Sequence, residues 1–161
     1  MGKIFGWKRI KNKMSLEEFY NFILISETLA TSGQPTEAQM SEIAVAGYKV
    51  VVNLALGKSE NALADEAGTV SALGMDYHHI PVVWEAPKLS DFEQFVPLMD
   101  TLAGQKVFLH CVANYRASMF TALYGEKRWG WTRAQADAHI RRIWEPDEVW
   151  ARFIEDVRGI K

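Results

Sequence analysis

The sequence predicts an α/β fold, a single domain in which a central, mostly parallel sheet of four or five strands is flanked by helices. Short apolar runs rich in β-branched residues alternate with longer segments that carry helix caps and stops, which is the order typical of parallel sheets. The run KVVVNLAL at residues 49–56 is almost wholly apolar, as expected of a strand that is buried on both faces. A chain of 161 residues is long enough to bury one core.

Caps and breakers set the bounds of the predicted elements. Strands are expected at residues 29–34, 49–56, 76–83 and 106–111. Helices are expected after Ser15 and at residues 36–47, 59–74, 90–104, 116–129, 132–144 and 146–157. Gly47, Gly74 and Gly104 end three of these helices, because glycine readily adopts the left-handed conformation found at helix ends. Pro97 predicts a kink or a later start in the helix at residues 90–104.

The charges are unevenly distributed along the chain. The net charge is −2, which gives no global attraction to nucleic acid, so no such partner is expected. The first 13 residues nevertheless carry five basic side chains and no acidic one. We therefore divide the chain into a basic N-terminal segment with a short helix, residues 1–20, and a folded domain, residues 21–161. The basic segment is expected to be solvated or loosely docked, with contact to a membrane surface or an acidic partner as the alternative.

We expect neither a secretory signal nor a membrane span. No apolar stretch follows the basic residues, and none approaches the length that crosses a bilayer. The single cysteine excludes an internal disulfide and suits a reducing, cytoplasmic location. His78 and His79 are neighbours on a predicted strand, so their side chains point to opposite faces. Neither a metal site nor a cofactor is therefore expected.

That cysteine lies in the string HCVANYRAS, residues 110–118. A predicted strand leads directly into the string and a predicted helix follows it, at the edge where parallel sheets bind ligands. A loop that curls between Cys111 and Arg116 points its N–H groups inward at an anion, and the helix adds its positive end. The string therefore predicts an anion-binding site that carries a sulfur nucleophile.

Each residue of the string has a predicted role. Helix N-termini, nearby cations and converging N–H groups stabilise a thiolate, so Cys111 is the expected nucleophile. The guanidinium of Arg116 matches oxyanions through two parallel hydrogen bonds. His110 is expected to bond to the backbone and hold the loop in shape. We expect substrate contacts from the rest of the loop and the first helical turn, namely Val112, Ala113, Asn114, Tyr115, Ala117 and Ser118.

Three of these residues carry more specific expectations. Asn114 lies where tight curling requires a positive φ, which Asn tolerates better than most residues. Ser118 is placed to donate to the thiolate. Tyr115 is expected either to form a wall of the substrate pocket or to turn into the core.

Four tryptophans in the last third are expected to pack the C-terminal helices onto the sheet, with an exposed partner surface as the alternative: Trp129, Trp131, Trp144 and Trp150.

The chain resembles the cysteine-dependent protein tyrosine and dual-specificity phosphatase superfamily. It is most similar to a bacterial branch, the phosphatase-like domain of beta-lactamase hydrolase-like proteins. The resemblance rests on TSGQP at residues 31–35, GYKVVVNLAL at residues 47–56 and HIPV at residues 79–82, ahead of HCVANYRAS. It extends over residues 28–125 and implies that residues 21–161 form a phosphatase-like catalytic domain.

The resemblance also implies a mechanism, in which Cys111 carries a cysteinyl phosphate and Arg116 binds the phosphate of a small molecule or a phosphoprotein. The general acid of the superfamily is usually an Asp on a loop upstream of the cysteine. In the corresponding segment, residues 82–91, the nearest carboxylate is Glu85, which becomes the candidate acid. Asp91 is expected instead in the first turn of a helix.

Two positions depart from the superfamily pattern. Ala117 follows Arg116 where Ser or Thr is common, and Asn114 stands where this branch commonly has Gly. Both departures argue against efficient phosphatase activity. Ala117 and the missing upstream Asp would also suit an inactive module that only binds oxyanions.

The spacing between Cys111 and Arg116 leaves a different reaction open. Four residues separate them, whereas the familiar phosphatase loop has five, and one residue fewer shortens the loop by about 3.5 Å. Counted inclusively the loop has six residues, the length that rhodanese-like sulfurtransferases use. These enzymes take sulfur from a sulfane-sulfur donor as a cysteine persulfide and need no general acid. A cysteine-dependent phosphatase is thus the expected function, with a sulfurtransferase as the alternative and a binding module third.

Overall fold

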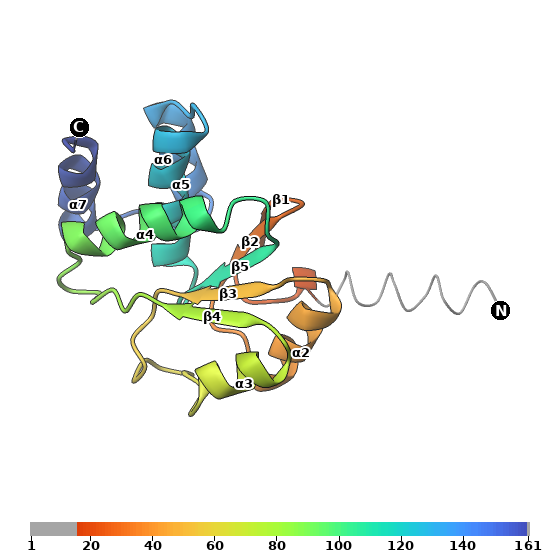
Figure 1. Ribbon diagram of the computed structural model, residues 1–161. Coiled ribbons are helices and arrows are strands. Elements are labelled where there is room, and N and C mark those ends of the chain that lie inside the picture. Colours follow the sequence, from red (N-terminus) through yellow and green to blue (C-terminus); the bar gives the residue numbers. More distant parts are fainter. Residues whose placement is uncertain (1–15, 161) are drawn as a thin grey trace.

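A five-stranded sheet with the order β1-β2-β5-β3-β4 forms the centre of the protein in a computed structural model that describes residues 16–160 (Figure 1). β2, β5, β3 and β4 run parallel, and β1 pairs antiparallel with β2 at one edge. The strands are β1 Ile23–Ser26, β2 Leu29–Ser32, β3 Val50–Asn53, β4 Asp76–His79 and β5 Val107–His110. The predicted fold class is confirmed, and the sequence patterns missed only β1 among these strands.

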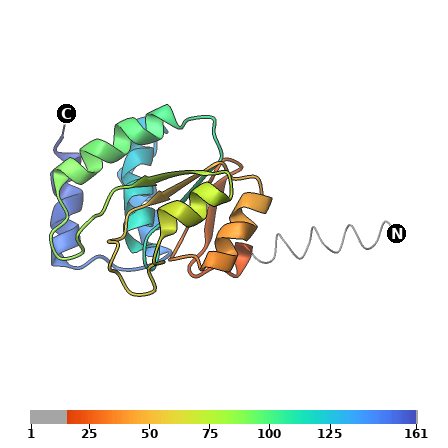
Figure 2. The ribbon, with the colours of Figure 1, turned by 60° about the horizontal axis from the view of Figure 1, so that its bottom comes forward.

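Helices cover both faces of the sheet, as Figure 1 and Figure 2 show. α2 and α3 lie on one face, and α4, α5, α6 and α7 lie on the other. Their bounds are α2 Glu37–Val45, α3 Glu66–Ala72, α4 Leu89–Thr101, α5 Tyr115–Arg128, α6 Arg133–Arg141 and α7 Glu148–Arg158. In the described part of the chain, no helix combines the length and the apolar character needed to cross a membrane.

The two central strands divide the core into two clusters. Val50, Val52 and Leu109 pack on the side of α4–α7, whereas Val51 and Phe108 pack on the side of α2 and α3. The alternation follows from the pleat, which sends successive side chains to opposite faces. All five side chains are buried, as expected for strands that helices cover on both faces.

α3 begins later than the sequence patterns indicated, at Glu66 rather than at residue 59. Asp65 is the N-cap, and its carboxylate accepts a hydrogen bond from a backbone amide of the first turn at 3.0 Å. The preceding residues form turns, in which Asn61 has a φ of 64°. An aspartate cap satisfies a free helix amide, so α3 begins directly after Asp65. The small residues before it had suggested a longer helix.

α4 begins at Leu89 and runs through Pro97. The predicted later start of this helix is therefore wrong. The Lys88 amide donates to the Asp91 carboxylate at 3.0 Å, so Asp91 lies in the first turn, as expected for an acid near the positive end of a helix.

The C-terminal tryptophans pack unevenly against the helices. Trp150 is fully buried, whereas Trp129 is 41% exposed. Trp131 and Trp144 are half-buried against the core cluster on the α4–α7 side.

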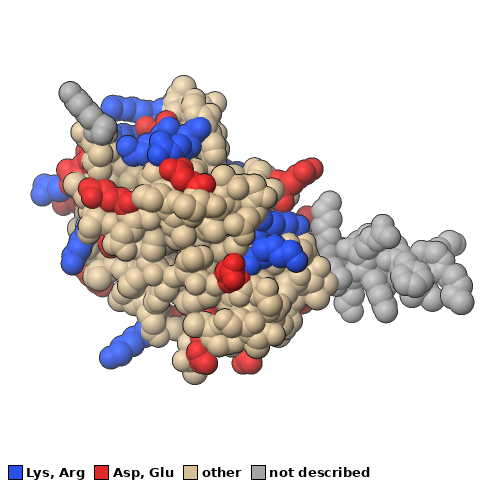
Figure 3. All heavy atoms as spheres, viewed as in Figure 1, with Lys and Arg blue, Asp and Glu red and all other residues tan. Residues whose placement is uncertain are grey.

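The surface carries charges of both signs. Figure 3 shows acidic and basic side chains in several small groups on one face of the described residues, with broad uncharged areas between them. Within residues 16–160, His, Cys, Asp and Glu side chains nowhere gather in groups of three that could hold a metal ion. Most of the predicted basic segment lies outside the described residues, and the division at residue 20 stays a prediction.

Candidate active site

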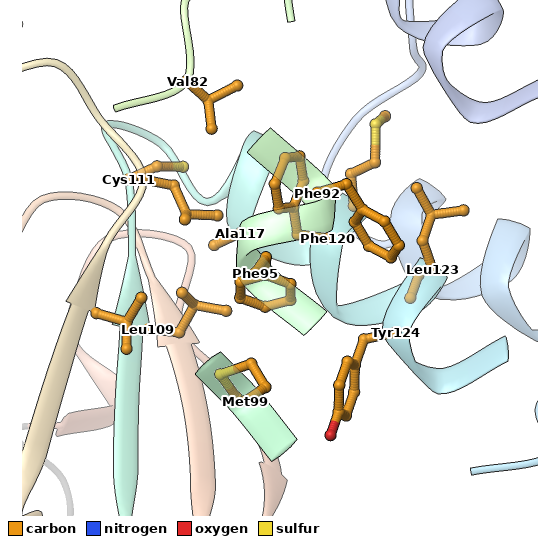
Figure 4. Close-up of a cluster of buried hydrophobic side chains, with 14 of the residues drawn as sticks. Val82, Phe92, Phe95, Met99, Leu109, Cys111, Ala117, Phe120, Leu123 and Tyr124 are labelled. Atoms are coloured by element: carbon orange, nitrogen blue, oxygen red, sulfur yellow. The ribbon is translucent and has the colours of Figure 1, made fainter. Parts of the chain in front are cut away.

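Cys111 follows β5 at the carboxyl edge of the sheet. The ends of three parallel strands lie in register there, because His110 pairs with Ser32 on one side and with Asn53 on the other. The Cys111 amide donates to the Ser32 carbonyl at 3.4 Å, and the side chain is fully buried. Its neighbours include Ala117 and Val82 in the apolar cluster drawn in Figure 4.

The loop after Cys111 curls tightly before α5 begins. Asn114 has a φ of 68° and is the N-cap of α5, which confirms the positive φ expected at this position. The amides of Val112 and Ala113 and the first three amides of α5 have no acceptor among the described residues. Free N–H groups of a curled loop and of a helix N-terminus together form a cradle suited to an anion.

The segment after β2 fixes one side of this loop. The Gln34 amide donates to the Val112 carbonyl at 2.9 Å. At Gly33 a side chain does not fit, because a Cβ atom there would lie 2.6 Å from the Val112 carbonyl oxygen. The glycine in TSGQP therefore allows the backbone of one loop to approach the other.

Two asparagines fix the other side of the loop. The Asn21 side chain donates to the Ala113 carbonyl at 2.9 Å, and the Asn114 side chain donates to the Asn21 carbonyl at 2.7 Å. Asn114 also donates to the Thr31 hydroxyl at 3.0 Å and is fully buried. Its side chain thus holds the loop from behind, which sequence reasoning did not foresee.

Arg116 is the second residue of α5 and is 5% exposed. Its Nη1 donates to the Val82 carbonyl at 2.8 Å, and the guanidinium carbon lies 5.7 Å from the ring centroid of Trp84. Its Nε is buried and has no acceptor within residues 16–160. Anchoring by Nη1 leaves Nε and Nη2, the edge of the guanidinium that binds two oxygens of an oxyanion.

His110 lies beneath the loop and is fully buried. Its Nδ1 lies 3.2 Å from the Cys111 carbonyl oxygen, which agrees with the expected backbone contact. Its Nε2 lies 2.7 Å from the Glu66 carboxylate. Burial raises the pKa of Glu66, but the hydrogen bond and the charge of His110, with two neutral donors, outweigh it and hold the pKa below its usual range.

The two remaining loop residues with specific expectations make local contacts. The Ser118 hydroxyl donates to the Tyr115 carbonyl at 3.1 Å, so its one proton is committed to the backbone rather than to Cys111. The Tyr115 ring is half-buried and stacks on Trp144, with centroids 4.7 Å apart and planes 4° apart. A second aromatic ring, Trp84, lies 5.9 Å from it, so aromatic rings adjoin the loop on this side.

Glu85, the candidate acid, is exposed in a turn directly after Trp84. The hydrogen bonds and ion pairs of residues 16–160 do not join it to Cys111 or Arg116. Val82 and Trp84 contact Arg116, so the segment that leads into the turn of Glu85 is held beside the loop.

Sequence reasoning missed three side chains that support the loop: Asn21, which donates to the Ala113 carbonyl, Glu66, which lies against His110, and Gln34, whose side chain donates to Glu66 at 2.9 Å.

Comparison with known proteins bears on the family and the fold of the chain. The family described as "DSP-PTPase phosphatase fused to NAD+ Kinase" matches residues 3–140. A DUF442 phosphatase from Shewanella putrefaciens CN-32 is 35% identical, with a TM-score of 0.81 over 93% of this chain and 97% of that one. TpbA of P. aeruginosa is 20% identical with a TM-score of 0.68, over 88% of this chain and 86% of that one, which supports the fold alone.

A beta-lactamase hydrolase-like protein from Xylella fastidiosa (strain Temecula1) is 32% identical over 102 residues, which are 62% of this chain and 23% of the relative. The match thus spans about a quarter of the length of that curated relative. Together with the family match over residues 3–140, these findings confirm the resemblance seen in the sequence. The chain belongs to the family of dual-specificity-type phosphatases that occur fused to NAD+ kinase.

Proposed function

We propose that the protein hydrolyses a phosphomonoester through a cysteinyl phosphate on Cys111. The observation that carries the proposal is the free edge of the Arg116 guanidinium, buried beside a loop whose amides have no acceptor in residues 16–160. Both sets of donors suit the oxygens of a phosphoryl group, and stabilising charge that develops in the transition state is a main source of catalysis. Membership of a phosphatase family supports the same reaction.

The reaction has two steps in this proposal. The Cys111 thiolate forms a bond to phosphorus as the bond to the leaving oxygen breaks, and that oxygen takes a proton from a general acid. Water then gives a proton to the carboxylate that the first step left on the general acid and forms a new bond to phosphorus as the sulfur–phosphorus bond breaks, so that inorganic phosphate leaves and both the thiolate and the acid are restored. Arg116 and the loop amides bind the three non-bridging oxygens throughout.

Glu85 is the acid that we propose for the first step. Glu85→Gln is expected to slow an aryl phosphate with a poor leaving group by about 100-fold or more, and one with a good leaving group far less. Equal slowing of both substrates would remove Glu85 from this role.

The substrate class is a phosphorylated small molecule or a phosphoprotein. Because members of the family occur joined to NAD+ kinase, NADP+ is tested beside an aryl phosphate and a phosphotyrosine peptide. Release of inorganic phosphate is measured for each at matched concentrations.

The six-residue loop keeps sulfur transfer as the second candidate reaction. One preparation is assayed with an aryl phosphate and with thiosulfate plus cyanide, and Cys111 is examined by mass spectrometry for a persulfide. We expect phosphate release that Cys111→Ser abolishes while the fold is retained. Thiosulfate turnover without phosphate release would overturn the proposal, and phosphate binding without either reaction would favour a binding module.

A further inference from the structure

Two carbonyl groups in the segment between β4 and α4 accept hydrogen bonds from side chains of other helices. The Val82 carbonyl accepts from Nη1 of Arg116 on α5 at 2.8 Å. The Trp84 carbonyl accepts from the indole Nε1 of Trp150 on α7 at 3.1 Å. The Val82 amide also donates to the carbonyl of Leu54, which follows β3, at 3.0 Å. The segment is therefore fixed to the sheet, to α5 and to α7 before α4 begins.

Trp150 is committed to this contact by its place in α7. It lies in the first turn of the helix, where its amide donates to the carboxylate of the N-cap Asp147 at 3.0 Å. Its side chain is fully buried, with the ring centroids of Phe153 and Trp84 5.2 and 5.3 Å away. An indole has one N–H donor and no acceptor, so this side chain makes a single hydrogen bond, and Trp84 receives it.

The ring of Trp84 lies against the guanidinium of Arg116. The guanidinium carbon is 5.7 Å from the ring centroid, a distance at which the face of an indole attracts a cation. The rings of Trp144 and Tyr115 adjoin the Trp84 ring, with centroids 5.2 and 5.9 Å away. Because Nη1 is bonded to the Val82 carbonyl, that carbonyl and the Trp84 ring together define the direction of the free edge of the guanidinium.

We propose that Trp150 is a positioning residue for the oxyanion site, which acts through Trp84 on the guanidinium of Arg116. Its N–H fixes the Trp84 carbonyl, so the Trp84 ring keeps its place over the guanidinium. The free edge of Arg116 then stays beside the free amides of the cysteine loop. The proposal rests on the proposed function, because it takes Arg116 as the phosphate ligand. It makes the C-terminal helix α7 part of the support of the site.

The first test replaces the indole by a ring that has no donor. Trp150→Phe is expected to weaken the binding of inorganic phosphate by about three- to tenfold, the fold-change that corresponds to one hydrogen bond. Calorimetric titration measures the affinity, and urea unfolding under the same conditions shows that the variant is folded. An unchanged phosphate affinity in folded Trp150→Phe would overturn the proposal.

Val157→Ala is the matched control on the same helix. Val157 is 2% exposed and belongs to the same core cluster, so the variant loses packing but keeps the bond between Trp150 and Trp84. It should lower the midpoint of urea unfolding and leave the phosphate affinity unchanged. If both variants weakened binding equally, loss of packing in α7 would explain the effect and the proposal would be wrong.

A double variant shows whether the effect passes through Arg116. When Arg116→Ala is already present, Trp150→Phe should weaken phosphate binding no further, because no guanidinium remains to be positioned. A second loss of the same size in the double variant would contradict the route through Arg116.

Phosphate binding requires no turnover, which separates this proposal from the proposed function. A wild type that binds phosphate but hydrolyses no phosphomonoester would refute the proposed function and leave the test of Trp150 decisive. A wild type that hydrolyses phosphomonoesters, with a Trp150→Phe variant of equal phosphate affinity, would refute the role of Trp150 alone.

Discussion

The two sides of the sheet hold the cysteine loop by different means. On the side of α2 and α3 the contacts are polar and directional, with the Glu66 carboxylate bonded to His110 beneath Cys111. On the side of α4–α7 the loop rests on apolar side chains, where Cys111 and Ala117 join a cluster that includes Phe120 (Figure 4).

Each side also contains one buried histidine, and the two differ in their partners. His110 has an acceptor at each ring nitrogen. His139 on α6 is 6% exposed, its Nε2 is buried with no partner among residues 16–160, and it lies 5.3 Å from the Trp131 ring centroid. Burial without a partner favours the neutral form of His139.

The largest stability effect is expected on the apolar side. Phe120 is fully buried, and its ring centroid lies 5.3 Å from Phe95 and 5.6 Å from Phe153. Phe120→Ala should lower the free energy of unfolding by about 3–5 kcal/mol, because it removes apolar contacts and leaves a cavity. Urea unfolding measures the change. Val45→Ala, at a 70% exposed position of α2, is the control and should cost less than about 0.5 kcal/mol.

Arg116 lies between the two sides, and its loss should affect binding more than folding. Arg116→Ala is expected to weaken binding of inorganic phosphate by about 1.5–3 kcal/mol, the range for hydrogen bonds to charged groups. Arg116→Lys keeps the charge but not the planar fork, so it should recover only part of the loss. Calorimetric titration with phosphate measures both, and equal affinity in wild type and Arg116→Ala would argue against the oxyanion role.

We expect the stability of the protein to depend on pH through His139, which is buried in its neutral form. Burial, with a smaller effect of the nearby Arg142 charge, lowers the pKa of His139 from 6.5 to about 4. Between these values the unfolded chain binds a proton that the folded protein does not, so wild-type stability falls as the pH drops through 6.5 toward 4. At pH 5 the loss attributable to His139 is about 1–2 kcal/mol.

His139→Gln removes this contribution. The stability difference between variant and wild type, measured by urea unfolding at pH 7.5 and pH 5, should therefore shift in favour of the variant at the lower pH. The same difference at both pH values would mean that His139 titrates normally in the folded protein.

Most of the fold follows from local sequence patterns. The apolar runs that became β3 and β5 had no competing interpretation, and Gly47 ends α2 with a φ of 96°, as a helix-stopping glycine should. β1 was not predicted; it has only four residues, and its Leu24 is 58% exposed on an edge strand. α4 starts at Leu89 and continues through Pro97, so the later start was wrong, because tertiary packing outweighs the propensity of one residue, and the kink stays a prediction.

The residues of the site also differ in whether the sequence alone could predict them. Cys111 and Arg116 could be predicted because one loop of six residues contains both. Glu66 could not, because its contact with His110 joins residues 44 apart in the chain and depends on where α3 begins. Acidic side chains at the start of a helix are usually solvated, so only the three-dimensional structure distinguishes this one.

The smallest effect is expected at Asn114, where two contributions can be separated. Asn114→Gly removes the hydrogen bonds to the Asn21 carbonyl and the Thr31 hydroxyl but retains a residue suited to a φ of 68°. Asn114→Ala removes the same bonds and adds strain in the left-handed region, so it should be less stable than the glycine variant by about 1 kcal/mol. Urea unfolding measures the difference. Equal stability of the two variants would mean that the loop relaxes to a negative φ, and phosphate affinity should then fall in the alanine variant because the free amides no longer converge.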